Sequence, residues 1–93
     1  MISGVIPDYI ISQNYPNPFN PETKINYSIP KDGMVKIKIY DITGREITTL
    51  VNEYKLPGFY TVSFNGSKYA SGVYFYRVIN GSRHASSKMI LMK

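Results

Sequence analysis

Apolar and polar residues alternate along the chain in short segments, which Gly, Pro, Asn and Asp residues separate. A period of two is typical of β-strands that bury one face, and no stretch shows the longer period of a helix. The pattern predicts strands at residues 23–29, 34–40, 45–51, 59–65, 72–80 and 83–92, with a further candidate near 9–13. We therefore predict an all-β fold, an immunoglobulin-like antiparallel β-sandwich of about seven strands (six to eight).

The strand predicted at residues 34–40 is the most regular. Val35, Ile37 and Ile39 are expected to point into the core, and the lysines between them are expected to point to solvent. The next residues, Asp41 to Gly44, predict a tight type I turn closed by a glycine with positive φ, because such a turn joins antiparallel strands.

Two other strands carry their apolar residues in a different pattern. In residues 45–51, Ile47, Leu50 and Val51 compete for the inward positions. Residues 72–80 are apolar on both faces, which is typical of a strand that lies centrally in a sheet and is covered on both sides.

A predicted hairpin closes the sequence. Asn80-Gly81 tolerates the positive φ values of a two-residue turn. We therefore expect residues 83–92 to pair back onto the strand 72–80 and to lie at a free sheet edge. A free edge can extend the sheet of a partner or of a second copy, so strand addition and dimerisation by edge pairing both remain open.

A proline-rich segment precedes the first regular strand. It consists of Asn14, Tyr15, Pro16, Asn17, Pro18, Phe19, Asn20 and Pro21. The prolines remove backbone donors, so the segment is not an interior strand, and they are expected to keep it extended. Tyr15 and Phe19 are expected to anchor it across one end of the sandwich, over a sheet edge or the mouth of the core. The alternative is a proline-rich ligand for a partner protein.

The net charge of +5 is unevenly distributed. Residues 1–53 carry five basic and six acidic groups, whereas residues 54–93 carry six basic groups and no acidic one. The basic half is either a surface for an anionic partner or a set of solvated cations on outward strand positions. Because the cations are spread singly and no recognition motif accompanies them, we do not expect nucleic acid as a partner.

The N-terminal residues carry no targeting signal that we recognise. They lack the charged start and the apolar stretch of a secretory signal peptide. No run of about eighteen apolar residues is present, so we predict no transmembrane segment. We interpret residues 1–9 as a linker from an upstream cargo domain or as the start of an expressed fragment, and residues 10–93 as one domain.

Residues that could perform catalysis are scarce. His84 is the only histidine, there is no cysteine, and the six acidic residues are scattered singly. No histidine pair has the spacing of a zinc site, and no acidic run matches a calcium-binding loop. The sequence therefore predicts no enzyme, no metal site and no cofactor.

The chain is rich in tyrosine, with nine residues. Tyr27, Tyr60, Tyr74 and Tyr76 are expected to pack between the sheets, each with its hydroxyl group at the rim. The alternative is an exposed platform that stacks on sugars or binds a protein, as in a cell-surface or carbohydrate-binding module.

Four segments, in order and at compatible spacing, resemble one known family. They are residues 11–21 (ISQNYPNPFNP), 39–46 (IYDITGRE), 71–77 (SGVYFYR) and 88–93 (KMILMK). Together they resemble the type A C-terminal sorting domain of the type IX secretion system. The fold of that family is also similar to the immunoglobulin-like domain of the flagellar hook-cap protein, which keeps a structural adaptor as an alternative.

The resemblance implies a C-terminal secretion signal of a larger exported protein from the Bacteroidetes or a related phylum. The cargo would cross the inner membrane by its own signal, pass through the periplasm, and reach the cell surface or the medium. The implied partners are the outer-membrane translocon, an associated shuttle barrel and a sortase-like peptidase. In many members this peptidase removes the domain and joins the cargo to lipopolysaccharide.

The motifs define two sets of site residues. The first set, expected to be structural, is the proline-rich segment together with Asp41, Gly44, Arg45, Gly72 and Tyr74. The second set, expected to be recognised by the translocon, is Lys88, Met89, Ile90, Leu91, Met92 and Lys93. Removal of residues 90–93 is expected to abolish export and to leave most of the fold.

Overall fold

The structure is a computed structural model in which residues 11–93 are described. These residues form β1 (Glu22–Ile29), β2 (Gly33–Tyr40), β3 (Glu46–Lys55), β4 (Gly58–Asn65), β5 (Gly72–Asn80) and β6 (Arg83–Leu91). All six regular strands are confirmed, with bounds that differ from the prediction by one residue or none, except in β3. The predicted linker at residues 1–9 and the start of the candidate strand at 9–13 lie outside the described residues.

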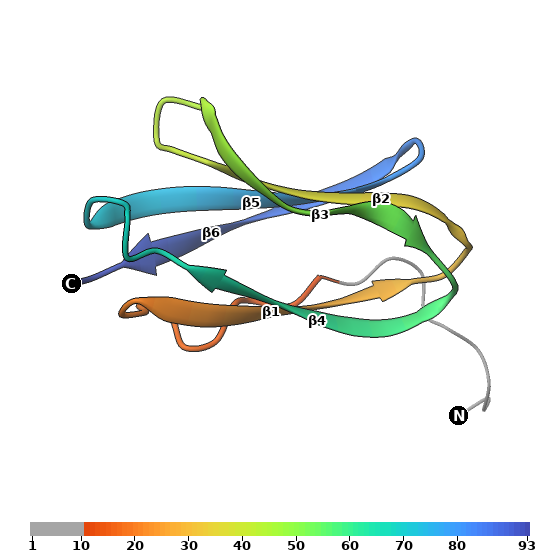
Figure 1. The fold of residues 1–93 in the computed structure, drawn as a ribbon, viewed down its shortest axis with the longest axis horizontal. Helices are drawn as coiled ribbons and strands as arrows, with labels where there is room; N and C mark the ends of the chain where they lie inside the picture. Colours follow the sequence, from red (N-terminus) through yellow and green to blue (C-terminus); the bar gives the residue numbers. More distant parts are fainter. Residues whose placement is uncertain (1–10) are drawn as a thin grey trace.

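The strands form two antiparallel sheets that lie face to face as two layers (Figure 1). One sheet has the order β1-β4, and the other has the order β3-β2-β5-β6. The immunoglobulin sandwich uses the same scheme, with the strands named B and E in one sheet and C′, C, F and G in the other. The predicted β-sandwich is therefore confirmed.

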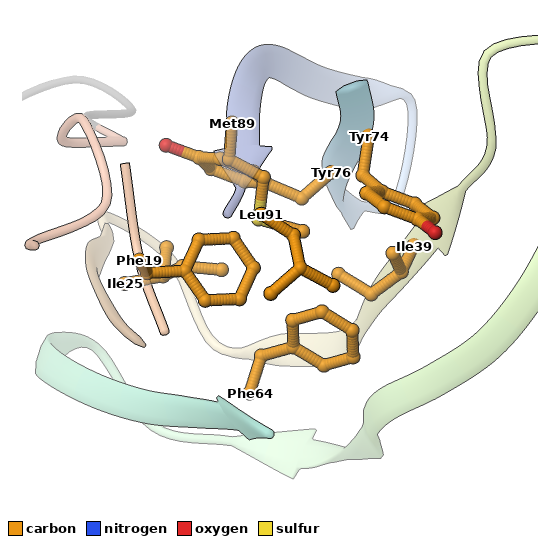
Figure 2. Packing of buried hydrophobic residues seen from close by; sticks show 8 residues of the cluster. All are labelled: Phe19, Ile25, Ile39, Phe64, Tyr74, Tyr76, Met89 and Leu91. Carbon is orange, nitrogen blue, oxygen red and sulfur yellow. The ribbon is translucent and has the colours of Figure 1, made fainter. Parts of the chain in front are cut away.

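The core fills the space between the inner faces of the sheets. The alternation predicted for β2 is confirmed, because Val35, Ile37 and Ile39 are fully buried. One group of buried side chains, shown in Figure 2, consists of Phe19, Ile25, Ile39, Phe64, Tyr74, Tyr76, Met89 and Leu91. A second group consists of Tyr27, Ile29, Val35, Ile37 and Val78.

The strand β3 is longer and less regular than predicted. It runs to Lys55, and its register with β2 shifts twice, so that Leu50 and Ile47 have no directly opposite residue. Such β-bulges insert an extra residue and redirect side chains. Both bulged residues therefore pack against the core together with Val51. This accommodates the three residues that compete for the inside in the sequence pattern.

The strand β5 lies between β2 and β6, as predicted, but only one of its faces is covered. Tyr74, Tyr76 and Val78 point into the core, whereas Phe75 on the other face is 36% exposed. The prediction of a strand covered on both sides is therefore wrong. The physical reason is that no third layer packs on the outer face of this sheet within residues 11–93.

The described end of the candidate strand at 9–13 follows β1 without becoming a continuous strand. Ile11 forms an isolated antiparallel bridge with Tyr27 of β1. The N–H of Ser12 donates to the carbonyl of Asn26 at 2.9 Å. The first described residues thus already lie along the outer edge of β1.

Candidate recognition site

The proline-rich segment connects the two sheets at one side of the sandwich. It begins beside β1, where Tyr15 and Lys24 exchange two backbone hydrogen bonds of 2.9 and 3.0 Å. Four residues later, Phe19 forms a parallel bridge with Leu91 of β6. The segment bends at residues 16–18 and again at residues 20 and 21. The predicted extended shape is therefore wrong, because the segment turns from one sheet to the other, but the predicted cover of a sheet edge is confirmed.

The outer edge of β6 is occupied where the segment meets it. Phe19 donates its N–H to the carbonyl of Ile90 and accepts the N–H of Met92, both at 2.9 Å. The N–H of Ile90 donates to the Asn17 side-chain oxygen at 3.0 Å. β6 is thus an edge strand, as predicted, but the predicted free edge is wrong over these residues, because the proline-rich segment supplies their hydrogen-bond partners.

Phe19 is the apolar anchor of the segment. It is 1% exposed, and its ring meets that of Phe64 edge-on with centroids 5.9 Å apart. Figure 2 shows it beside Leu91 at the centre of the core group. The packing is tight, because a Cβ atom on Gly66 would lie 2.9 Å from Leu91 and 3.3 Å from Phe19. Tyr15 is 81% exposed, so its predicted anchoring role is wrong: its backbone, not its ring, attaches the segment to β1.

Asn14 is the polar centre of the same side, and it is buried. Its side chain donates to Thr23 Oγ1 of β1, and its backbone N–H donates to the Tyr76 hydroxyl of β5, both at 3.0 Å. The Gln13 side-chain amide donates both to Asn14 Oδ1 and to the carbonyl of Lys88 in β6. The network thus satisfies buried polar groups from three strands and fixes the segment. The only signal for it in the sequence is an asparagine at the head of the proline motif.

The six terminal residues expected to be recognised differ in burial. Met89 and Leu91 are fully buried and belong to the core. The other four, Lys88, Ile90, Met92 and Lys93, are exposed or half-buried. Removal of residues 90–93 would therefore take part of the core away. The expectation that most of the fold survives this removal does not fit the burial of Leu91.

The turn between β2 and β3 is built by Asp41, Gly44 and Arg45. The Asp41 carboxylate accepts the backbone N–H groups of Thr43 at 2.9 Å and of Arg45 at 3.1 Å. A hydrogen bond from the Thr43 hydroxyl lowers the pKa of the Asp41 carboxyl below its ordinary value. Gly44 has a φ of 87°, which favours glycine. The predicted tight turn with a positive-φ glycine is confirmed, and the contacts of these residues are local.

The remaining motif residues and the other tyrosines belong to the structure of the sandwich. Gly72 opens β5 at the surface, and Tyr74 is buried with its hydroxyl donating to a carbonyl of the preceding loop at 2.6 Å. Tyr27 is buried between the sheets and Tyr60 is half-buried, with their rings stacked at 5.5 Å. The Tyr76 hydroxyl is not at the rim, since it donates to the Ser12 carbonyl at 2.7 Å under the proline-rich segment.

The four-stranded sheet presents a basic and aromatic face to solvent. We call it the outer face and define it by Lys36, Lys38, Tyr40, Phe75, Arg77 and Lys88, which alternate with core residues. The register sets Lys38 opposite Arg77, and it sets Phe75 between Tyr40 and Lys88. The sequence predicted the outward lysines of β2. It did not predict their meeting with Arg77 and Lys88, because that depends on the order of the strands.

Three further findings concern metal-binding groups, membrane-spanning helices and the histidine. Within residues 11–93, no three His, Asp or Glu side chains are grouped so that they could hold a metal ion. No helix in this part of the chain is long and apolar enough to cross a membrane. His84 is exposed, with Nδ1 3.3 Å from a terminal nitrogen of Arg77. The candidate binding features, which rest on exposure and strand register, are the exposed terminal residues and the outer face.

Comparison with known proteins identifies one family. The model of the secretion system C-terminal sorting domain matches residues 13–92 of the 93-residue chain. No curated protein and no solved structure matches the chain significantly. The matched range begins one residue before the proline-rich segment and ends just after β6, so it contains both this segment and the strand edge that it covers.

Proposed function

Because the chain belongs to the secretion system C-terminal sorting domain family, we propose that it directs a larger cargo protein through the type IX system across the outer membrane. The observation that carries this proposal is the family match over nearly the whole chain. The domain acts by protein–protein recognition and performs no chemistry on the cargo. The cargo is attached upstream of the proline-rich segment, and residues 1–9 form the linker to it.

The route follows from the resemblance. The cargo and the domain pass through the periplasm, where the outer-membrane translocon and its shuttle barrel recognise the domain. The cargo then reaches the cell surface or the medium. A sortase-like peptidase removes the domain at the surface, and the linker is the segment offered for cleavage. The domain thus acts as a sorting signal for the cargo.

Recognition at the C-terminal end uses side chains more readily than backbone groups. Lys88, Ile90, Met92 and Lys93 present side chains to a partner, whereas Met89 and Leu91 hold them in place from the core. Addition of a partner strand along Ile90 and Met92 would require the proline-rich segment to leave, since it already occupies their backbone groups. We therefore propose side-chain recognition of these four exposed or half-buried residues.

An export assay tests this function. Residues 1–93 are fused to the C-terminus of a fluorescent protein that carries an ordinary periplasmic signal, in a bacterium with a working type IX system. Fluorescence at the surface and in the medium is compared with that in the periplasm. We expect export that disappears in a translocon-deficient strain. Retention of the intact fusion in the periplasm of the competent strain would refute the proposal.

The contribution of the terminal residues is tested with matched variants. Met92→Ser combined with Lys93→Ser removes two exposed side chains and leaves the core intact. The control is Ile42→Ser combined with Lys31→Ser, which removes an exposed apolar and an exposed basic residue from distant turns. We expect a loss of export in the first variant alone. Equal export of both would limit recognition to other surfaces.

A further inference from the structure

The outer face of the four-stranded sheet combines four cations with a single acid. Lys36, Lys38, Arg77 and Lys88 lie on it by alternation with buried neighbours. The acid is Glu46 of β3, which lies opposite Tyr40 of β2. Its carboxylate is 3.1 Å from the Lys38 ammonium group. The other three cations have no ion pair within residues 11–93, although Lys36 also attracts the Glu46 carboxylate at longer range.

This arrangement does not favour the isolated domain. Lys38 and Arg77 lie directly opposite each other on neighbouring strands, where like charges destabilise a sheet. The Arg77 Nε atom is buried and has no hydrogen-bond partner within residues 11–93. The terminal nitrogen of Arg77 donates to Nδ1 of His84 at 3.3 Å, an acceptor that carries no negative charge to balance the guanidinium group. A carboxylate at one of these positions would stabilise the sheet, so the uncompensated positive charge points to an acidic partner.

The centre of the outer face is apolar. Phe75 is 36% exposed although it lies on the central strand, and Tyr40 is directly opposite it on β2. A shallow depression of about 310 Å³ lies over these two residues and extends to Gly44 and Arg77. Aromatic and arginine side chains within a polar rim are typical of protein–protein interfaces. An extended polyanion would make no use of an apolar centre.

We propose that the outer face binds an acidic surface on a protein component of the secretion machinery, with Phe75 at the centre and Lys36 and Lys88 at the rim. This inference rests on the proposed function and adds to it the surface and the charge of the partner. Four strands about 4.8 Å apart and about 26 Å long offer about 400 Å². This is about half of one partner's share of a standard interface, so the contact is transient and its rim charges mainly accelerate association.

Paired charge reversals test the surface. Lys36→Glu with Lys88→Glu changes two exposed cations of the outer face, and Lys24→Glu with Lys68→Glu changes two exposed cations elsewhere. Both double variants alter the net charge by the same amount. In the export assay with residues 1–93, we expect export to fall about tenfold or more in the first variant and to stay unchanged in the second. Lys36→Arg with Lys88→Arg should keep wild-type export. Because Lys88 also belongs to the terminal residues proposed above to be recognised, Lys36→Glu alone must also lower export relative to Lys24→Glu alone.

The outcomes separate the two proposals. If the wild-type fusion is not exported, the proposed function fails and this inference fails with it. If the wild type and the Lys36→Glu/Lys88→Glu variant are exported equally, only this inference is overturned. Both variants must unfold cooperatively at the wild-type midpoint in circular dichroism. Should the outer-face variant fail to do so, the folded Phe75→Ser variant replaces it, and undiminished export of that variant overturns the inference.

The class of the partner is tested by photo-crosslinking in the exporting strain. A photoreactive amino acid replaces Phe75 on the outer face or Thr61, which is exposed on the other sheet. We expect position 75 to crosslink to an outer-membrane protein of the type IX system, and position 61 not to do so. Crosslinks of position 75 only to lipopolysaccharide, or equal crosslinks from both positions, would overturn the proposal of an acidic protein surface.

Discussion

The two sides of the sandwich are built in different ways. On the side of β1 and β6, which we call the closed side, the proline-rich segment hydrogen-bonds to both strands and inserts Phe19 between the sheets. On the side of β3 and β4, which we call the open side, a short turn joins the strands, and no further strand of residues 11–93 pairs with the outer edge of β3. Large apolar residues near that turn, Leu56 and Phe59, are 66% and 68% exposed.

This difference assigns a role to the motifs at the two ends of the domain. The closed side joins residues more than 60 positions apart, such as Asn14 to Tyr76 and Asn17 to Ile90. The N-terminal motif and the C-terminal motif are therefore one structural unit, and each is needed to position the other. A partner can then recognise only the side chains that remain exposed when the proline-rich segment covers the edge of β6.

The largest expected effect is that of removing residues 90–93 from the closed side. The deletion takes away the buried Leu91 and the hydrogen bonds of Phe19 to Ile90 and Met92. We expect a loss of unfolding free energy on the order of 5 kcal/mol, which approaches the whole stability of a small domain. Urea unfolding followed by circular dichroism measures it. A deletion variant with a midpoint close to that of the wild type would contradict the assignment of Leu91 to the core.

Loss of the Phe19 ring is expected to have the next largest effect. Phe19→Ala leaves a cavity against Phe64 and Leu91, and we expect it to lower the free energy of unfolding by about 3–5 kcal/mol. Tyr15→Ala is the matched control four residues away. Because Tyr15 is exposed, its loss should change stability by about 0.5 kcal/mol or less. Equal effects of the two substitutions would show that the segment is not anchored through Phe19.

Loss of the Tyr76 hydroxyl tests the polar part of the closed side. Tyr76→Phe keeps the packing but leaves the Ser12 carbonyl and the Asn14 N–H without their partner. We expect a cost of about 1–3 kcal/mol, because unsatisfied buried groups lose their hydration. Tyr74→Phe, which removes a single bond to a partly buried carbonyl, should cost less in the same unfolding experiment. A larger cost for Tyr74→Phe would show that the hydrogen bond from Tyr74 to the loop before β5 stabilises the fold more than those of Tyr76 do.

The sequence predicted the strands well because their alternation is local, but it predicted the closed side only in part. Phe19 could be chosen as an anchor, but nothing in the sequence favoured it over Tyr15, since both are aromatic residues of the same proline-rich segment. The pairing of Phe19 with Leu91 and of Asn14 with Tyr76 depends on contacts between distant residues, which periodicity does not encode. The bulges that bring Ile47 and Leu50 inward could not be predicted either, because they depend on the register between β2 and β3.

The open side should tolerate substitutions that the closed side does not. Thr49 is exposed on β3, whose outer edge pairs with no further strand of residues 11–93, and Thr49→Lys should change stability by about 0.5 kcal/mol or less. Since the β6 edge is occupied at Ile90 and Met92, we propose that any dimerisation by edge pairing uses β3. A lysine there should weaken self-association, because charged residues protect sheet edges. Sedimentation velocity at high concentration measures it, and Ser86→Lys on β6 is the control.

The smallest effect is expected from acidic pH, and it falls on the turn at the start of the open side. Hydrogen bonds from Thr43 to Asp41 and from Lys38 to Glu46 lower the pKa values of these two carboxyls below their ordinary values of 3.8 and 4.5. A carboxyl with a lowered folded-state pKa stabilises the fold above its ordinary pKa, and this contribution is lost as the pH falls through the folded-state value. The melting temperature should therefore be constant near neutral pH and fall slightly below pH values of about 4. Asp41→Asn with Glu46→Gln keeps acceptor oxygens and removes both titrations, so its melting temperature should fall less over the same range. An equally steep fall in that variant would assign the acid sensitivity to other groups, and would leave the turn as a purely steric element of the open side.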